Sequence, residues 1–366
     1  MHVKPVNLFC FFFLALIFSC AQKTENEVVL ESDSDLLSKV GLVNIEGIRV
    51  MEELPSYTTY DMLITSDYLV FCNGIPNPYY FNVIGLNQMK VVGSVGREGG
   101  GPNEFAGILR SSVLRSNILS IHSSGMGQRM YQFNLDSALI SSSYEVPKVF
   151  DFDQRNVQRT GWIGKGYYVQ TNLRDTTRLT VINESGQTVN KFLKYPFEDE
   201  LKSTRPEVYG TIFQSALVTN SASQKAALFN YNGPNWDIVS FENPLAPEIV
   251  SQVHLRSIHY RDESVIKEKS RYFAAAIYPD NKKGFLDATS NDEYIYALYS
   301  GKSIEMSGEE AYYGQIVLQL DWDGKLVKRL KLDQPTKVIC INRDGSKLYA
   351  IVENNQFDSL YEYNLN

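Results

Sequence analysis

Short apolar runs alternate with turn-forming residues along almost the whole chain. Aromatic and β-branched residues occur in runs of four to seven, and clusters of Gly, Asn, Asp and Pro separate these runs. This pattern predicts β-strands that are joined by tight turns. The best helical candidate is a single short segment, Asp262–Arg271. The sequence therefore predicts an all-β fold.

One type of strand recurs at intervals of 49 to 67 residues, which indicates a repeat. A second apolar strand follows each copy, often with a turn and a further strand, as in Arg129–Ile140, Arg178–Val189 and Gly314–Leu330. Six units of about 55 residues, each with about four strands, fit a six-bladed β-propeller with four-stranded antiparallel blades. A two-domain β-sandwich is the alternative architecture. The recurring strands begin at Tyr68, Ile118, Tyr167, Ala227, Tyr294 and Lys347.

The two ends of the repeat predict how the ring closes. The last unit ends at Ser359–Asn366, one strand short of a full blade, while Gly41–Leu54 holds a spare strand before the first unit. An N-terminal strand added to the last blade would hide both open edges. We therefore expect this strand to close the last blade of a propeller that spans residues 39–366.

The N-terminus has the features of an export signal. Lys4 precedes the apolar run Leu8–Phe18, and Ser19 and Cys20 follow it. The stretch Ile17–Cys20 resembles the lipobox of bacterial lipoproteins. This resemblance implies a signal peptide at residues 1–19, lipidation of Cys20 and a flexible tether over residues 20–38. An uncleaved membrane anchor is the alternative, although the apolar run has about half of the ~20 residues that a span needs.

Several segments of the predicted propeller resemble one family. Val92–Gly107 (VGSVGREGGGPNEFAG) looks like the glycine-rich junction between blades in NHL-type and TolB-like propellers. Gly284–Lys302, Val317–Asp333 and Ser346–Asn355 also resemble the TolB-like six-bladed propellers of bacterial lipoproteins. Together with the lipobox, the resemblance implies a protein on the outer membrane or cell surface of a Gram-negative bacterium.

Charge and cysteine content narrow the range of partners. The formal net charge is −7 and the chain has no basic stripe, which argues against nucleic acid as a partner. Contact with a membrane is therefore expected from the acyl chains on Cys20, and we expect a monomer. Cys72 and Cys340 lie in apolar strands, where buried free thiols are commoner than a disulfide.

The sequence contains no motif that would define an active site. Gly96–Gly101 is not followed by the helix or the Lys-Ser/Thr of a phosphate-binding loop. No histidine or cysteine spacing fits a zinc site, no Gly-x-Ser-x-Gly occurs, and Asp321 and Asp323 have the spacing of turn formers. We therefore predict no catalytic residue, metal ligand or cofactor. Spacing cannot reveal a calcium site that several blades build in a central channel.

The remaining candidate residues lie in loops. Arg97 and Glu104 are expected to pair across the junction loop or to face the central channel. Tyr79 and Tyr80 beside Pro76–Pro78, and Tyr312 beside Gly308–Ala311, are candidates for rings at the rim that contact a sugar or an apolar peptide group. The sequence favours a non-catalytic binding or scaffold propeller for a peptide, glycan or partner protein. The alternative is a metal-dependent hydrolase or lyase with its active site at the channel.

Overall fold

The computed structural model describes most of residues 27–365. The predicted signal peptide, Cys20 and most of Asp262–Arg271 lie outside the described residues. The residues that the structure describes are 27–30, 38, 40–54, 59–101, 103–123, 128–141, 144–152, 157–198, 205–255, 258–262, 275–353 and 358–365.

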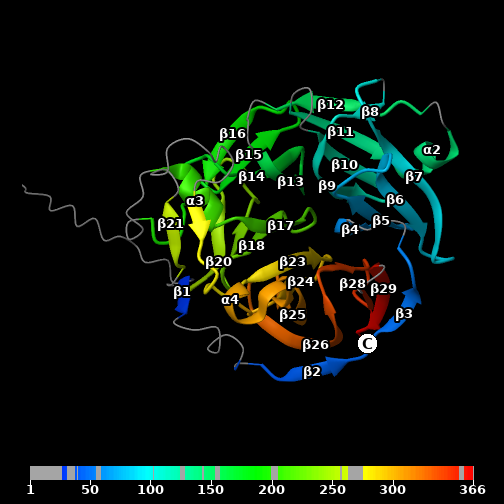
Figure 1. The fold of residues 1–366 in the computed structure, drawn as a ribbon. Coiled ribbons are helices and arrows are strands. Elements are labelled where there is room, and N and C mark those ends of the chain that lie inside the picture. Colours follow the sequence, from blue (N-terminus) through cyan, green and yellow to red (C-terminus); the bar gives the residue numbers. More distant parts are fainter. Residues whose placement is uncertain are drawn as a thin grey trace, which may run out of the picture.

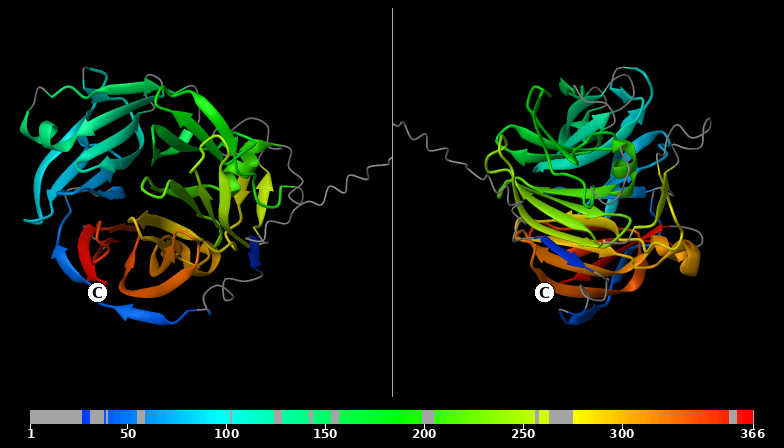
Figure 2. Two further views of the ribbon diagram at one scale, coloured as in Figure 1. Left: turned by 180° about the vertical axis from the view of Figure 1, so that it is seen from behind. Right: turned by 90° about the vertical axis from the view of Figure 1, so that its left-hand side faces the viewer.

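Six β-sheets stand around a central axis as the blades of a propeller (Figures 1 and 2). Each of the first three blades begins with its innermost strand, and neighbouring strands within their four-stranded cores are antiparallel. Blade 1 consists of β4 (Thr59–Ile64), β5 (Tyr68–Asn73), β6 (Tyr79–Gly85), β7 (Lys90–Glu98) and the short β8 (Glu104–Phe105). Blade 2 consists of β9 (Ile108–Arg115), β10 (Ile118–Ser123), β11 (Arg129–Asn134) and β12 (Lys148–Asp151). Blade 3 consists of β13 (Val157–Gly164), β14 (Tyr167–Asn172), β15 (Leu179–Asn183) and β16 (Thr188–Phe192).

The other three blades also carry strands from the N-terminal segment. Blade 4 consists of β17 (Ser215–Asn220), β18 (Lys225–Asn230), β19 (Trp236–Ser240) and β20 (Glu248–Leu255). Blade 5 consists of β23 (Phe285–Ser290), β24 (Tyr294–Tyr299), β25 (Gly314–Asp321) and β26 (Leu326–Thr336). Blade 6 consists of β27 (Val338–Ile341), β28 (Lys347–Glu353), β29 (Asp358–Asn364) and β3 (Ile48–Met51).

The recurring strand of the sequence is the second strand of every blade, so the predicted six-bladed all-β propeller is confirmed. These strands are β5, β10, β14, β18, β24 and β28. The last five residues of β5, β10, β14 and β24 are buried. Most residues of β18 and β28 are buried as well. A strand that is buried on both faces reads as a continuous apolar run, which explains why this strand is the most visible part of the repeat.

The N-terminal segment follows the outer edges of blades 4, 5 and 6 in turn (Figure 1). Strand β1 (Glu27–Leu30) pairs in parallel with β20, and β2 (Leu42–Ile45) pairs in parallel with β26. Strand β3 pairs antiparallel with β29 and takes the outermost position of blade 6. Strand β1 falls within the predicted tether of residues 20–38, so at least these four residues form a strand.

Apolar side chains fill the spaces between neighbouring blades. Between blades 4 and 5, the rings of Phe229 and Phe285 meet edge to face with their centroids 5.0 Å apart, and Trp236 packs against both. Removing such surface from water stabilises the fold by about 25 cal/mol per Å². Cys72 and Cys340 are buried free thiols in other clusters of this core.

The two faces of the ring differ. One face carries longer connections, which we call the long-loop face; it holds α3 (Pro206–Ile212), β21 (Tyr260–Asp262), β22 (Ala275–Ile277), α4 (Ile304–Ser307) and the 3₁₀ helix η2 (Gly308–Tyr312). The opposite face carries the tight turns, including Asn183–Gly186 and Asp321–Gly324, which confirm two predicted reversals. No helix in the described part of the chain has the length and apolar character that crossing a membrane requires.

One predicted reversal is wrong. Asn134–Ser137 was expected to turn into a further strand, but Leu135–Ile140 forms helix α2 instead. The side chain of Asn134 accepts a hydrogen bond from the Ser137 backbone N–H at 3.1 Å, and Asp136 lies in the first turn. Both features favour the start of a helix.

Candidate functional site at the mouth of the central channel

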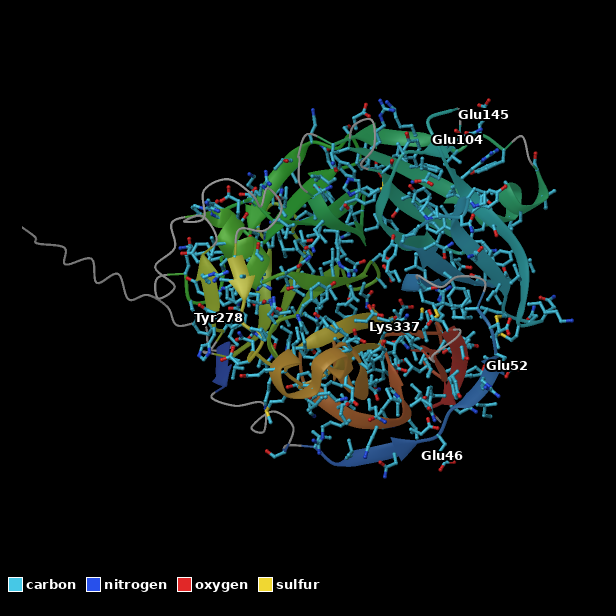
Figure 3. The ribbon with its side chains drawn as sticks, viewed as in Figure 1. Glu46, Glu52, Glu104, Glu145, Tyr278 and Lys337 are labelled. Carbon is cyan, nitrogen blue, oxygen red and sulfur yellow. The ribbon has the colours of Figure 1, made fainter. Side chains whose placement is uncertain are left out.

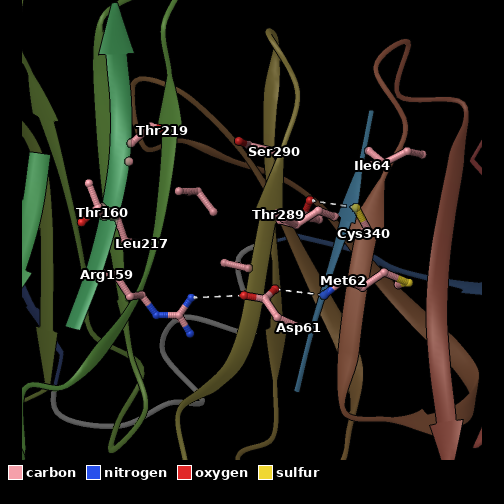
Figure 4. A pocket seen from close by; sticks show the side chains of 14 residues that line it. Asp61, Met62, Ile64, Arg159, Thr160, Leu217, Thr219, Thr289, Ser290 and Cys340 are labelled. Carbon is pink, nitrogen blue, oxygen red and sulfur yellow. Dashed lines mark hydrogen bonds and ion pairs between the residues drawn. The ribbon is translucent and has the colours of Figure 1, made fainter. Parts of the chain in front are cut away.

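A cavity of about 190 Å³ opens into the centre of the ring (Figure 4). Its lining comes from the innermost strands of five blades: β4, β13, β17, β23 and β27. At roughly 30 Å³ per molecule of liquid water, this space holds about six waters. The cavity is therefore large enough for a small ligand.

Charged side chains from blades 1, 3 and 5 converge near the long-loop end of this channel. Nη1 of Arg159 lies 4.0 Å from Oδ2 of Asp61, and both side chains are 12% exposed. Arg159 also donates to the hydroxyl of Tyr231, which follows β18. Asp287 is 8% exposed, and its Oδ2 accepts the backbone N–H of Ile339 at 2.9 Å.

A β-bulge precedes each of these charged residues. The register of the innermost strand shifts between Thr59 and Asp61, between Val157 and Arg159, and between Phe285 and Asp287. The innermost strand of blade 2 has the same shift just before Arg110. An extra residue bends a strand and redirects the side chain that follows it, and bulges are frequent beside functional sites. The innermost strands of four blades thus have a bulge at an equivalent position, immediately before a charged residue.

Burial and neighbouring charges set the protonation of the cluster. Burial raises the pKa of Asp287 to about 7, and the nearby carboxylate of Asp61 acts in the same direction. Burial by itself would lower the pKa of Arg159, but Tyr231, Asp61 and Asp287 outweigh it and raise that pKa. The site therefore combines a permanent cation, an acceptor carboxylate and a second carboxyl group that changes charge near neutral pH.

The rest of the cavity lining is rich in hydroxyl groups. These belong to Thr160, Thr219, Thr289 and Ser290, and the Oγ1 of Thr289 lies 3.9 Å from Sγ of Cys340. Burial raises the pKa of the Cys340 thiol far above its usual range, so this sulfur is not an activated nucleophile. Among the described residues, no group of three or more His, Cys, Asp or Glu side chains is placed to hold a metal ion.

The residues singled out from the sequence lie away from this cavity. Nε of Arg97 is 3.7 Å from Oε1 of Glu104, so these side chains pair across the junction loop, and Figure 3 shows Glu104 at the outer rim. Tyr80 is buried in the core between blades 1 and 2, and Tyr79 is half-buried at the start of β6. Tyr312 is 49% exposed, and Nζ of Lys283 lies 5.2 Å from its ring centroid.

The sequence motifs do not identify Asp61, Arg159 and Asp287, although the sequence contains a signal for them. Each is the only charged residue in the first six positions of an innermost strand: TYDMLI, VQRTGW and FLDATS. Each also stands seven or eight residues before the recurring strand of its own blade, as does Arg110 in ILRSSV. A charged residue at one fixed offset in several repeats is the pattern that would have indicated a shared position at the axis.

Comparisons with known proteins agree with this architecture. The model of the TolB-like 6-blade propeller-like family matches residues 51–344, and the chain therefore belongs to that family. No curated protein matches the chain.

Similar solved structures include a DUF4221 family member from Bacteroides vulgatus, at 14% identity and a TM-score of 0.53, covering 87% of this chain and 98% of that one. Regucalcin, a calcium-binding protein from Agrobacterium tumefaciens, matches at 10% identity and a TM-score of 0.48, covering 88% and 94%. At these identities the likeness to the Bacteroides vulgatus structure shows the fold alone.

Proposed function

We propose that this protein is a non-catalytic binding propeller that Cys20 anchors to the cell envelope, where it presents its long-loop face and channel mouth to a ligand. The lipobox resemblance supports the anchor, and membership of the TolB-like family supports the scaffold. The ligand classes that the sequence favoured are a peptide, a glycan or a partner protein.

The placement of Asp61 and Arg159 in the lining of one cavity, with the buried Asp287 close enough to interact electrostatically with both, is the observation that carries this proposal. Nε of Arg159 is buried and has no hydrogen-bond partner among the described residues. A buried donor without a partner is unfavourable, and a bound ligand or water would relieve it. Binding sites commonly combine such a cavity with a few convergent polar groups.

A metal-dependent hydrolase or lyase receives weaker support. Asp61 and Asp287 supply two carboxyl groups, but the positive charge of Arg159 lies only 4.0 Å from Asp61. A cation that is fixed beside a carboxylate opposes the approach of a divalent metal ion to it.

The anchor is tested with a Cys20→Ala variant expressed beside the wild-type protein. We expect the wild type in the membrane fraction with an acylated N-terminus, and the variant in the soluble fraction. A variant that stays in the membrane fraction at full mass would contradict the lipoprotein anchor.

The binding role is tested by thermal melting of the full-length protein against amino acids, short peptides and oligosaccharides. We expect at least one compound to raise the melting temperature, and mass spectrometry to recover that compound unchanged. Conversion of the compound, or a stoichiometric metal whose removal by EDTA lowers the melting temperature, would support the enzyme instead.

A further inference from the structure

We propose that the channel mouth binds a free α-amino acid, with the ligand's carboxylate on Arg159 and its ammonium group on Asp61, beside the buried Asp287. This inference rests on the proposed binding function and names the ligand class for one part of it. It follows from the charges and spacing of the channel cluster and from the unpartnered Nε of Arg159.

Arg159 offers a binding edge for a carboxylate. Its Nη2 donates to the Tyr231 hydroxyl and its Nη1 faces Asp61 at 4.0 Å, while Nε has no partner among the described residues. A guanidinium group binds a carboxylate with two parallel hydrogen bonds, one of which commonly comes from Nε. Tyr231 holds the guanidinium from one side and so limits its rotation. Nε is thus a buried donor without a partner, which a ligand oxygen at this edge would satisfy.

Asp61 offers an acceptor for an ammonium group in the same cavity, and a second carboxyl group, that of Asp287, lies buried nearby. The 4.0 Å separation of Asp61 from Arg159 is longer than a charged hydrogen bond, and Oδ1 of Asp61 accepts the backbone N–H of Met62 at 3.0 Å. Asp287 is buried and electrostatically coupled to both Asp61 and Arg159. An ammonium group would add a positive charge beside two carboxyl groups and would favour the ionised form of Asp287.

The mixture of charges disfavours simpler ligands. An anion alone would be attracted by Arg159 but repelled by the carboxylate of Asp61. A cation alone would be attracted by the carboxylates but repelled by Arg159. A ligand that carries both charges satisfies the two requirements together. In an α-amino acid a single carbon separates the two charged groups, which suits protein groups that lie 4.0 Å apart.

The size and lining of the cavity fit the rest of such a ligand. About 190 Å³ is available, and the hydroxyl groups of Thr160, Thr219 and Ser290 line the space beyond the charged cluster. These groups can donate or accept hydrogen bonds. The cavity is small, and the two ends of a longer peptide would be too far apart to reach Arg159 and Asp61 together.

The first experiment is calorimetric titration of full-length wild-type protein at pH 8. The twenty L-amino acids are compared first, and the best binder is then compared with its C-terminal amide and its N-acetyl derivative. We expect one or more amino acids to bind, and each blocked derivative to bind at least 10-fold more weakly. Derivatives that bind as well as the free amino acid, or acetate or ammonium ions that bind as tightly, would overturn the proposal.

The second experiment uses Arg159→Gln and Asp61→Asn, with Glu104→Gln at the outer rim as the matched control. We expect at least 10-fold weaker binding for the two channel variants and unchanged binding for the control. Because the blocked ligands test the wild-type protein, the proposal stays testable if a channel variant fails to fold. If peptides or oligosaccharides bind unchanged while no amino acid does, this inference fails and the proposed binding function stands.

Discussion

The guanidinium of Arg178 at the start of β15 pairs with the carboxylate of Asp237 in β19, and so joins blade 3 to blade 4 through a buried ion pair. Their side chains are only 3% and 0% exposed. Asp237 also accepts from Gln252 at 2.7 Å and contacts Nε2 of His254 at 2.8 Å. Burial by itself would raise the pKa of Asp237, but Arg178 and His254 outweigh it and hold that pKa below its usual range.

Replacing Asp237 by Asn should strongly destabilise the propeller. The substitution keeps the shape of the side chain but leaves Arg178 as a buried, unpaired charge, and breaking such a pair costs about 3–5 kcal/mol. Urea unfolding followed by fluorescence measures this change.

Asp323→Asn is the matched control for Asp237→Asn, because Asp323 forms an ion pair with Lys225 at 2.7 Å but its own side chain is 79% exposed. That variant should change the free energy of unfolding by less than about 1 kcal/mol. Similar losses for both variants would show that burial of the Arg178 pair is not the reason for its effect.

The contribution of Asp287 to the stability of the protein should fall as the pH rises from about 5 to 8. The pKa of Asp287 is about 7 in the folded protein and near 3.8 in an unfolded chain. Between these values the folded state holds a proton that the unfolded state has released, so its stabilising effect is lost as the pH rises through 7. A loss of ~1 kcal/mol from this group alone would lower the melting temperature by about 2–4 °C in a domain of 150–250 residues. The buried His122, whose pKa burial lowers to about 4, acts in the opposite direction below about pH 6.5.

Asp287→Asn separates this effect from those of other titrating groups. The variant cannot ionise at this position, so its melting temperature should depend less on pH between 5 and 8 than that of the wild type. Parallel curves for the two proteins would show that Asp287 does not titrate in this range.

Gly284→Ala should destabilise the fold next to the channel. A Cβ at this position would lie 2.0 Å from the carbonyl oxygen of Gly233 and 2.5 Å from that of Asn230, both of which are backbone atoms. Forcing an extra carbon into packed structure typically costs about 1–3 kcal/mol. The change is measured by urea unfolding.

Gly41→Ala provides the control for Gly284→Ala, because a Cβ at Gly41 meets nothing within 4 Å. Its effect on the free energy of unfolding should stay within about 0.5 kcal/mol. If Gly284→Ala were equally neutral, the close approach of the two backbone segments would not be required for the fold.

Local patterns in the sequence were sufficient to predict the class of fold. The second strand of each blade is buried on both faces, so it leaves an apolar run such as Tyr68–Cys72 or Tyr294–Tyr299 that recurs with the blade. Turn residues such as Asp321 and Gly324 mark the reversals between strands. The same kind of local reading gave the wrong structure at Leu135–Ile140, because the side chain of Asn134 caps a helix there.

The sequence by itself determined the repeat and the number of blades, which both depend on residues that are near one another in the chain. Only the tertiary structure brought Asp61, Arg159 and Asp287 together, since ring closure places blades 1, 3 and 5 around one axis. The bulges that precede these residues depend on pairing with the neighbouring strand, which hydrophobic periodicity does not record. The buried pair of Arg178 and Asp237 is likewise a product of packing between blades, because neither residue carries a local sign of its partner.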